Sequence, residues 1–544
     1  MLSHVLSSAV LGVDAYEVDV EVDVSSGMAG SINLVGLPDA AVKESVDRVR
    51  SAIRNSGMHF PYDKRITINL APADIRKAGP SFDLPIAIGL LAATGQIPED
   101  YLAGAVIIGE LSLDGAVRPV NGALPVAMGA RERQRTRLFV PAANAREASV
   151  VEGLDVYPVQ SLPQLATALA LPDTLEPLPY DPQVLNIEAL EYPLDFADVK
   201  GQAHVKRALE VAAAGGHNVL LIGPPGSGKT MMASRLPGIL PPMTSDEALA
   251  ATRLYSVAGL LSAEVSLVTT RPYRKPHHTV STAALAGGGT IPRPGEVSLA
   301  HHGVLFLDEL PEFGRDALEV LRQPLEDGVV SVARVSASYT FPASFTLIAA
   351  MNPCPCGYYG DAFRQCICSQ GAVAKYQKRI SGPLLDRIDL HIDVPRVPEE
   401  DLLHHTVSEG TAAIRQRVCR ARHQQAARFA SHLPTEPDTS DPASAAENIR
   451  EEGGQQPFHP HRRRLFCNAQ MGPKEIRAYC KTTEPVRNLL RAAIQQLGLS
   501  ARAYDRLLKV GRTIADLDGC EQIAPQHIAE AIQYRSLDRK LWGA

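Results

Sequence analysis

The pattern of apolar and polar positions divides this 544-residue chain into regions of different kinds. In residues 1–170, strand-like runs alternate with amphipathic helical stretches. The expected strands span residues 15–24, 65–70, 106–113 and 138–141, and the expected helices span residues 39–56 and 83–94. This alternation predicts an α/β or α+β domain over residues 1–170.

The middle and the end of the chain follow other patterns. Residues 171–196 are rich in proline and acid without a steady period, which indicates a linker. Residues 197–397 repeat strand, loop and helix, as expected of a parallel sheet covered by helices. The apolar spacing then becomes helical, in residues 398–430 and 465–544. Between these two stretches, residues 431–464 lack almost all aliphatic side chains, so we expect a disordered insertion there.

Composition and charge narrow the class of protein. The hydrophobic fraction of 45% is ordinary for a globular protein. No run of about 18 uncharged apolar residues is present, so we expect no membrane span. The first residues lack a basic segment and soon alternate valine with acid, as in a strand and unlike a signal peptide, so we expect a cytoplasmic protein. The net charge of −6 gives no general attraction to nucleic acid, so any DNA contact requires a local basic surface.

A glycine-rich loop follows a buried-strand pattern at residues 218–222. Its sequence, GPPGSGKT, consists of Gly223, Pro224, Pro225, Gly226, Ser227, Gly228, Lys229 and Thr230. Glycines let backbone N–H groups approach phosphates, and the N-terminus of the following helix favours negative charge. In such a loop the lysine reaches the β- and γ-phosphates, and the threonine hydroxyl binds Mg²⁺. The sequence therefore predicts an ATP site centred on Lys229 and Thr230.

Two further strand patterns end in polar residues that suit this site. Residues 304–307 precede Asp308 and Glu309, and residues 345–350 are followed closely by Asn352. We expect Asp308 to hold Mg²⁺, largely through water, and Glu309 to polarise the attacking water. Asn352 would contact the γ-phosphate or orient that water. An Asn–Pro pair alone is usually a turn, and it is the order of the three strands that favours the functional interpretation.

This combination of motifs resembles the AAA+ superfamily and, within it, the magnesium-chelatase-like ATPases of the ComM/YifB family. The resemblance covers essentially the whole chain. Besides GPPGSGKT it rests on RPYRKPHHTVSTAALAGGG (271–289), HHGVLFLDELPEF (301–313), AAMNPCPCG (349–357) and SGPLLDRIDL (381–390). It implies that Asn352 is the sensor-1 residue, that Arg387 is an arginine finger completing a neighbour's site, and that Arg502 is the sensor-2 arginine of a helical lid. It also suggests a homo-hexameric ring. The alternative for Arg387 is a helix-end arginine paired with Asp386 or Asp389.

The resemblance further implies a DNA motor, which the family associates with branch migration during integration of transforming DNA. Residues 316–328 have a helical pattern, and residues 329–345 alternate as in a β-hairpin with a turn near 334–338. In ring helicases resembling this branch, such a hairpin projects a basic residue into the pore, and Arg334 has that position. The expected partner is single-stranded or branched DNA, contacted through its phosphates. A plain surface hairpin is the alternative. Two other functions stay open: a chelatase motor for metal insertion into a porphyrin, and a protein-remodelling or regulatory ATPase.

Four of the eight cysteines form a C-x-C-x₉-C-x-C cluster directly after the Asn352 motif. The cluster consists of Cys354, Cys356, Cys366 and Cys368. Four thiolates so close together could close a tetrahedral Zn²⁺ site. Because C-x-C strains the ligation of one ion by both cysteines, free thiols remain the alternative. The histidine pairs at 277–278 and 301–302 lack a third ligand at metal spacing, and we expect them to pack or to form hydrogen bonds.

Residues 70–95 and 109–127 resemble the proteolytic domain of Lon proteases, with Ser81 at the position of the nucleophile. A serine needs a base for activation, and Lon proteases use a lysine shortly after a conserved Gly-Glu stretch. Here the corresponding residue is Leu124. We therefore expect a Lon-like domain without protease activity that serves oligomerisation or DNA contact. Since chelatase motor subunits lack such a domain, it favours the DNA motor.

Overall fold

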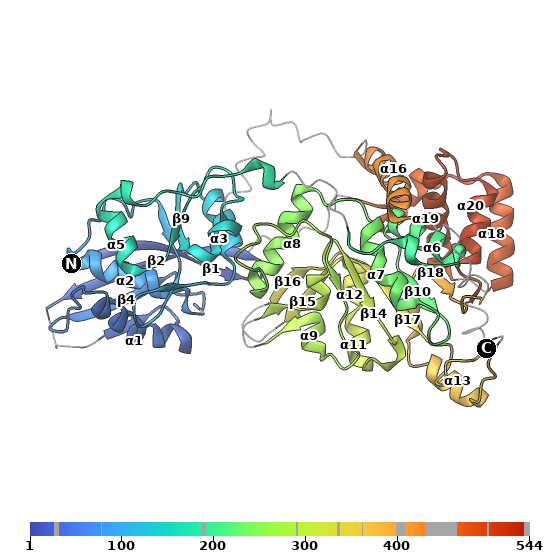
Figure 1. Cartoon of the computed structure of the whole chain (residues 1–544), viewed down its shortest axis with the longest axis horizontal. Coiled ribbons are helices and arrows are strands. Elements are labelled where there is room, and N and C mark those ends of the chain that lie inside the picture. The colour runs from blue at the N-terminus through green and yellow to red at the C-terminus, as the bar shows by residue number, and fades with distance from the viewer. Residues whose placement is uncertain are drawn as a thin grey trace.

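The computed structural model is elongated, with the N-terminal region at one end and the helical C-terminal region at the other (Figure 1). It describes residues 1–26, 32–77, 79–185, 192–289, 292–333, 338–361, 363–398, 409–430, 465–497 and 500–537. The predicted insertion at 431–464 and the predicted pore residue Arg334 therefore lie outside the described residues.

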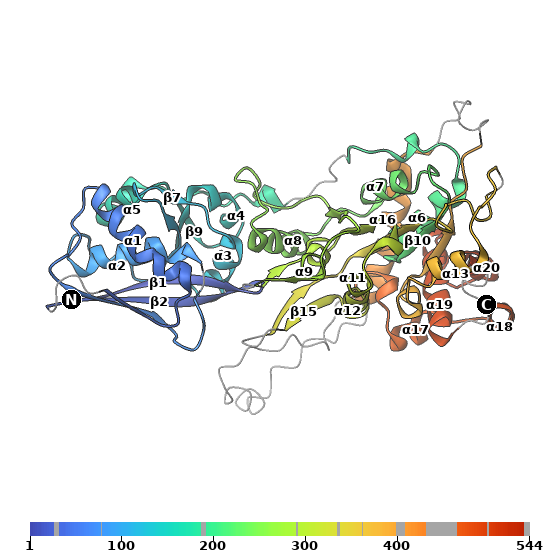
Figure 2. The same cartoon turned by 90° about the horizontal axis from the view of Figure 1, so that it is seen from below.

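The N-terminal region is a mixed sheet with helices packed on it. Its elements are β1 (Leu2–Leu11), β2 (Asp14–Ser25), β3 (Ile32–Val35), α1 (Ala40–Asn55), β4 (Arg65–Ala71), α2 (Asp83–Ala93), β5 (Ala105–Ile107), β6 (Glu110–Leu111), β7 (Val117–Arg118), α3 (Ala123–Glu132), β8 (Arg137–Pro141), α4 (Ala145–Ala148), β9 (Asp155–Val159) and α5 (Leu162–Ala170). Seven strands form the sheet in the order β3-β4-β2-β1-β5-β8-β9. Strand β2 alternates acids with the fully buried Val18, Val20 and Val22, which face the core. Helix α2 is buried along its whole length beside β1 and β2 (Figure 2).

One predicted strand of this region is wrong. Residues 106–113 form two short strands, β5 and β6, and not one. The chain leaves the sheet at Gly109, whose N–H donates to the carbonyl of Ser81 at 3.0 Å and whose carbonyl accepts from the Leu84 N–H at 3.0 Å. The backbone of Gly109 thus bonds to the start of α2 and to the short turn before it, which a pattern of apolar residues does not reveal.

The middle region carries a five-stranded sheet in the order β11-β14-β17-β10-β18. These strands are β11 (Tyr273–Arg274), β14 (Val304–Leu307), β17 (Thr346–Met351), β10 (Val219–Ile222) and β18 (Leu390–Asp393). Every adjacent pair is parallel. All residues of β10, β14 and β17 are buried, as in a sheet that is covered on both faces.

Different helices cover the two faces of this sheet. On one face, side chains such as Leu221 and Phe306 pack with α6 (Ala203–Gly215), α7 (Lys229–Ile239) and the C-terminal helices. On the other face, Leu220 and Leu305 pack with shorter elements. Those elements are α9 (Thr282–Ala286), α10 (Glu296–Leu299), α11 (Arg315–Val320), α12 (Arg322–Asp327), α13 (Gln370–Gln377) and α14 (Gly382–Leu385). This parallel, doubly covered sheet confirms the predicted α/β fold class.

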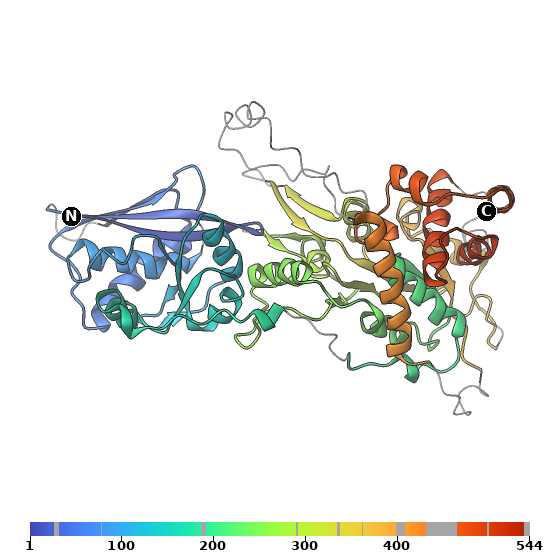
Figure 3. The ribbon, with the colours of Figure 1, turned by 90° about the horizontal axis from the view of Figure 1, so that it is seen from above.

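The C-terminal part is helical, as predicted. Its described helices are α16 (Thr411–Ala430), α17 (Pro473–Tyr479), α18 (Glu484–Leu497), α19 (Ala501–Leu517) and α20 (Pro525–Gln533). Helix α16, orange in Figure 3, packs against α6, α7 and α19. It buries Ile414, Val418 and Phe429 in the core cluster that also contains α6 and α19. No helix among the described residues is long and apolar enough to cross a membrane.

The predicted hairpin is present, and the helix predicted before it is interrupted. Strands β15 (Val329–Ala333) and β16 (Ser338–Pro342) pair antiparallel, with Val330 opposite Phe341. The helix expected over residues 316–328 is two short helices, α11 and α12, which meet at Leu321. Pro324 explains the break, because proline lacks an N–H and is accommodated only in the first turn of a helix.

Helix α8 (Ser245–Ala258) joins the N-terminal region to the sheet region. The Ser256 carbonyl accepts a hydrogen bond from the N–H of Gly122 at 3.0 Å. The Arg253 guanidinium donates to the carbonyl of Val13 at 3.0 Å and forms an ion pair with Asp14. The two regions therefore meet through directional hydrogen bonds and an ion pair.

Candidate nucleotide site

The glycine-rich loop turns sharply between β10 and α7. A Cβ at Gly223 would lie only 2.1 Å from the carbonyl oxygen of Val394, so a side chain cannot be accommodated there. Gly226 and Gly228 have φ angles of 77° and 87°, a region that glycine enters without steric cost. Gly228 is the N-cap of α7, so the loop ends at a helix N-terminus with its N–H groups free for an anion.

Lys229 lies at the centre of this loop. Its ammonium donates to the carbonyls of Gly223 at 2.7 Å and Pro224 at 2.9 Å, and it lies 3.3 Å from Oδ1 of Asn352. Burial lowers the pKa of Lys229 to about 8, although the nearby Asp308 carboxylate opposes that shift. A partly desolvated cation at this position attracts phosphate more strongly than one in water.

The acidic strand end lies beside the loop. Thr230 Oγ1 donates to Oδ2 of Asp308 at 2.8 Å, so a hydroxyl and a carboxylate oxygen lie side by side. Such hard oxygen ligands, with water, suit Mg²⁺. The next residue, Glu309, has φ 53°, a conformation that costs a residue with a side chain about 1 kcal/mol. Its Oε2 lies 3.4 Å from Nδ1 of His278. Asp308 of the predicted acid pair therefore contacts Thr230 of the predicted loop, and Glu309 follows it in the chain.

Asn352 lies between the phosphate loop and the acidic end of strand β14. Strand β17 lies between β10 and β14, with Met351 paired to Ile222 and Ala349 paired to Leu307. Because the three strands are parallel, their carboxyl ends meet at one edge of the sheet. The structure thus brings Lys229, Asp308 and Asn352 together, as the order of the strands predicts.

Lys275 belongs to this edge although sequence reasoning did not single it out. Its ammonium lies 3.2 Å from the same Asp308 oxygen that Thr230 contacts, and 5.2 Å from the centre of the Phe306 ring. The lysine follows the two-residue strand β11, which is parallel to β14. In the sequence, Lys275 is marked only as a cation that directly follows a strand. Strand β11 has two residues and is too short to be recognised from apolar residues alone.

Arg387 and Arg502 lie elsewhere. Arg387 precedes β18, and Leu390 at the start of that strand pairs with Val219 at the start of β10. Arg387 is therefore at the amino edge of the sheet, and a four-residue strand spans about 13 Å between the two edges. Its guanidinium forms an ion pair with Glu326 and donates to the carbonyl of Pro383 at 2.7 Å. The predicted alternative partners, Asp386 and Asp389, are not its ion-pair partners among the described residues.

A cavity of about 510 Å³ opens at this amino edge. Its lining includes the cations Arg271, Arg387, Arg422, Arg502, Arg506 and Lys509. Several of them are paired: Arg271 with Glu247 at 2.9 Å, and Arg506 with Asp389 at 3.2 Å. Arg502 is exposed and forms no ion pair with any residue that the structure describes. The amino edge thus carries a cavity lined by arginines, of which Arg502 is exposed, whereas the carboxyl edge carries the phosphate loop.

Asp389 contacts residues of several elements at this amino edge of the sheet. Burial alone would raise the pKa of this carboxyl, but hydrogen bonding to His217 and the charge of Arg506 hold its pKa well below the usual range. Its Oδ2 also accepts from the backbone N–H of Asn218 at 3.1 Å. Since Asn218 directly precedes β10 and Arg506 belongs to α19, the ionised carboxylate fixes the C-terminal helices to the base of the sheet.

Comparison with known proteins agrees with this geometry. Family models described as magnesium chelatase, subunit ChlI, as subunit ChlI of Mg-chelatase and as the ChlI C-terminal part match residues 195–402, 20–144 and 408–535. The chain is 43% identical to competence protein ComM of Haemophilus influenzae over 99% of its own length and 98% of that protein. It is 43% identical to the uncharacterised protein YifB of Escherichia coli over the same shares of the two chains. The chain belongs to the ComM/YifB family of magnesium-chelatase-like AAA+ ATPases.

Membership of the ComM/YifB family makes the chain an ATPase that uses ATP and Mg²⁺. The chain has a separate similarity to Lon protease 2 of Bacillus subtilis, 26% identical over 178 residues, which is 30% of this chain. Ser81 lies in the short 3₁₀ helix Pro80–Phe82, and Leu124, in α3, is fully buried. The buried Lys77 donates to the carbonyl of Pro72. The residue that the resemblance places at the position of the Lon lysine is thus a core leucine.

The structure of this ComM/YifB-family chain also shows where the predicted cysteine cluster and the histidine pairs lie. The sulfurs of Cys354, Cys356, Cys366 and Cys368 all lie within 4.8 Å of one another. His301 accepts from the N–H of Ser344 at 2.9 Å, and His302 lies 3.5 Å from Glu247. Burial lowers the pKa of His302 to about 4, so it is neutral at pH 7. The histidine pairs therefore form hydrogen bonds and pack, as expected.

Proposed function

We propose that this chain is a ring-forming ATP-driven DNA motor in which each nucleotide site is shared between two neighbouring subunits. The observation that carries the proposal is the separation of the site into two halves. Lys229 and Glu309 lie at the carboxyl edge of the sheet, while Arg387 and Arg502 lie at the amino edge. A head-to-tail contact between copies joins one edge to the other, and such contacts close into rings.

The residues at the carboxyl edge have distinct roles in this proposal. The loop N–H groups and Lys229 bind the phosphates, and Thr230 with Asp308 would hold Mg²⁺, which neutralises charge on the phosphates. Glu309 orients and polarises the attacking water, and Asn352 positions the γ-phosphate. Arg387 of the neighbouring subunit then stabilises the charge that develops in the transition state.

Two observations support DNA as the object that is moved. The relative from Haemophilus influenzae is named a competence protein, and we extend that role to this chain. In addition, α12 connects Arg387 to the hairpin. Its Glu326 forms an ion pair with Arg387, and strand β15 of the hairpin begins three residues after Glu326. A DNA contact at Arg334, which directly follows β15 in the sequence, would therefore be able to displace the arginine finger.

The test is ATP turnover measured without DNA and with single-stranded, duplex and four-way-junction DNA. We expect DNA to stimulate turnover, and Arg334→Glu to remove the stimulation because it reverses the charge in the pore. Arg491→Glu, at an exposed position of α18, is the matched control and keeps the stimulation. Stimulation that survives in Arg334→Glu would refute the pore assignment.

The matched family models are described by a magnesium chelatase subunit, which supports a second candidate: a motor for metal insertion into a porphyrin. The two candidates predict different activators. DNA would not change the ATP turnover of a chelatase motor in the assay above. Such a motor would instead drive Mg²⁺ insertion when partner subunits are added. A protein-remodelling ATPase would show neither response. For the Lon-like region we propose no protease activity, because Leu124 cannot act as a base.

A further inference from the structure

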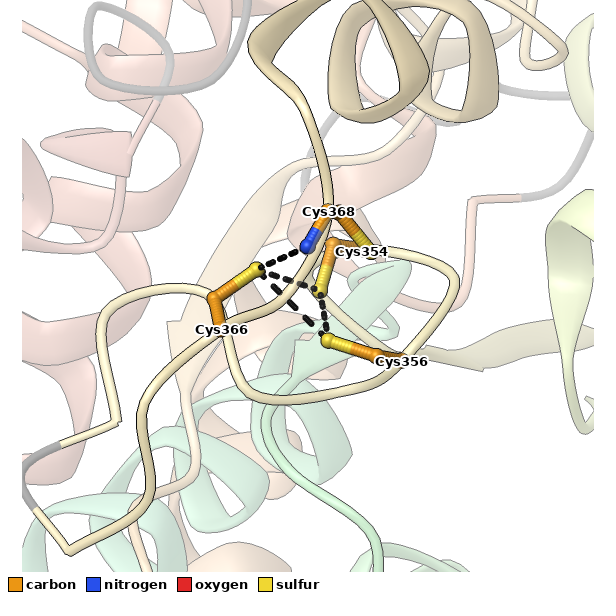
Figure 4. A group of neighbouring side chains, drawn as sticks. All are labelled: Cys354, Cys356, Cys366 and Cys368. Carbon is orange, nitrogen blue, oxygen red and sulfur yellow. Dashed lines mark hydrogen bonds between the residues drawn. The ribbon is translucent and has the colours of Figure 1, made fainter.

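The four-cysteine cluster has the geometry of a tetrahedral metal site. Cys354 Sγ lies 3.3 Å from the sulfur of Cys356 and 3.6 Å from that of Cys366, and the sulfurs of Cys356 and Cys366 are 3.5 Å apart (Figure 4). Four thiolates bound to one Zn²⁺ at 2.3 Å are separated by about 3.8 Å. The sulfurs are also grouped around one point, whereas disulfides would join them in separate pairs.

The loop that carries these cysteines lacks regular secondary structure, and its largest aliphatic and phenyl side chains are not buried. Between Cys354 and Ser369 the described residues form no helix or strand. The two large apolar side chains of this stretch, Phe363 and Ile367, are 75% and 88% exposed, so hydrophobic burial does not fix the loop. Loops of this kind are stabilised by cross-links or metals, and metal-binding free energy then becomes folding free energy.

The same loop touches the nucleotide site at two places. Cys354 is fully buried and follows Asn352 by two residues. Gly357 lies against the phosphate loop, since a Cβ there would be 2.5 Å from Cδ of Pro225. Below the loop, the Gln377 side chain donates to the carbonyl of Pro353 at 3.1 Å. A rigid cysteine loop therefore holds Asn352 and Pro225 in fixed relative positions.

We propose that Cys354, Cys356, Cys366 and Cys368 together bind one Zn²⁺, and that this site positions Asn352 beside Lys229. The four thiols lose their protons on binding, and the metal needs no open coordination position because its role is structural. The positioning role rests on the proposed ATPase mechanism, whereas the metal site itself does not.

The metal site is tested by elemental analysis of the full-length protein. We expect one zinc per chain, which the double variant Cys366→Ser, Cys368→Ser lacks and the control Cys520→Ser, at an exposed cysteine outside the cluster, retains. Because the double variant could fail to fold, the wild-type protein is also stripped with a chelator and reloaded with Co²⁺. Thiolate-to-cobalt charge-transfer bands and tetrahedral d–d bands are expected. A wild-type protein without zinc, which also shows no such bands after loading, would overturn the proposal.

The positioning role is tested separately, by comparing ATP affinity with turnover. Removing zinc is expected to lower kcat at least about tenfold while the Kd for ATP changes less than about threefold, because Asn352 acts on the γ-phosphate and the loop amides still bind. Re-addition of Zn²⁺ restores kcat. Unchanged kcat in the metal-free protein would refute positioning but leave the metal site. If the chain hydrolysed no ATP at all, the zinc content and the Co²⁺ spectrum would still decide the site.

Discussion

The Lys229 ammonium donates hydrogen bonds to two carbonyls of the phosphate loop, and burial lowers its pKa to about 8. Below that pH the free protein already carries the charge that attracts phosphate. Above it, the free protein is neutral at Lys229, and the phosphates raise the pKa in the complex, so binding takes up a proton. We therefore predict that the Kd for ATP is constant below pH about 8 and rises above it by up to about tenfold per pH unit.

The measurement is an ATP titration between pH about 7 and about 9.5, with hydrolysis blocked by Glu309→Gln. Lys229→Arg is the control, because a guanidinium stays charged over this range and should remove the pH dependence. A Kd that stays flat up to pH about 9.5 in the parent protein would show that Lys229 is protonated throughout.

Glu309 is predicted to act on the attacking water and not on ATP binding. Glu309→Gln should therefore lower turnover by about 10²- to 10⁴-fold, while the Kd for ATP changes little, because an amide cannot accept the proton. Glu312→Gln is the matched control: Glu312 lies three residues away and pairs with Arg379 at the surface. Equal losses in both variants would mean that Glu309 has no special role.

A site residue can be predicted from the sequence when the pattern that marks it lies in the residues next to it. Asp308 and Asn352 directly follow strands that are visible as apolar runs, and Lys229 follows a third such strand through the glycine-rich loop, so their convergence follows from parallel strands. Lys275 and Arg387 depend on more. Lys275 requires that β11 be the neighbour of β14, and Arg387 requires knowing which edge of the sheet it occupies. Both facts belong to the strand order, which no local pattern contains.

The same holds for the elements around the site. The hairpin was predicted correctly because strand alternation is a local property of residues 329–345. The uninterrupted helix over residues 316–328 was wrong because Pro324 starts a new helical turn. The long strand over residues 106–113 was wrong because Gly109 bonds to Ser81, a residue far away in the sequence. Sequence patterns thus predict the kind of element better than its limits, which are fixed by partners elsewhere in the chain.

Helix α12 is the element that we expect to couple the hairpin to the arginine finger. Its Glu326 pairs with Arg387, and β15 begins at Val329. Glu326→Ala should therefore reduce the ratio of DNA-stimulated to basal turnover several-fold, because hairpin movement no longer reaches Arg387. Glu319→Ala, which removes a carboxylate paired with Arg322 on the neighbouring helical turn, is the control. An unchanged ratio in Glu326→Ala would exclude this route of coupling.

At the scale of the whole molecule, α8 connects the N-terminal region to the arginine edge. Its first turn contains Glu247, which pairs with Arg271 at the cavity, and its last turn contains Ser256, which accepts from Gly122. The hairpin also approaches the N-terminal region, since a Cβ at Gly12 would lie 3.8 Å from the Tyr339 ring. The Lon-like region is thus placed to respond to both the hairpin and the subunit contact that we propose at the arginine edge.

A site shared between subunits makes a prediction that no single-chain mechanism makes. Lys229→Ala subunits lack a working phosphate loop but keep the arginine finger, and Arg387→Ala subunits have the opposite defect. Each alone should hydrolyse ATP at least about 10³-fold more slowly than the parent protein. Mixed in equal amounts, they should recover up to about one quarter of parental turnover, because one interface in four pairs an intact loop with an intact finger.

That fraction does not depend on the number of subunits, since every interface of a closed ring is formed by one loop and one finger. The matched control replaces the Lys229→Ala partner by the double variant Lys229→Ala, Arg387→Ala, which supplies neither half and should recover nothing. If Arg387 served its own chain, the first mixture would be as inactive as its components. Recovery in the first mixture alone therefore establishes that the two edges of the sheet, which lie apart in one chain, form one active site between two.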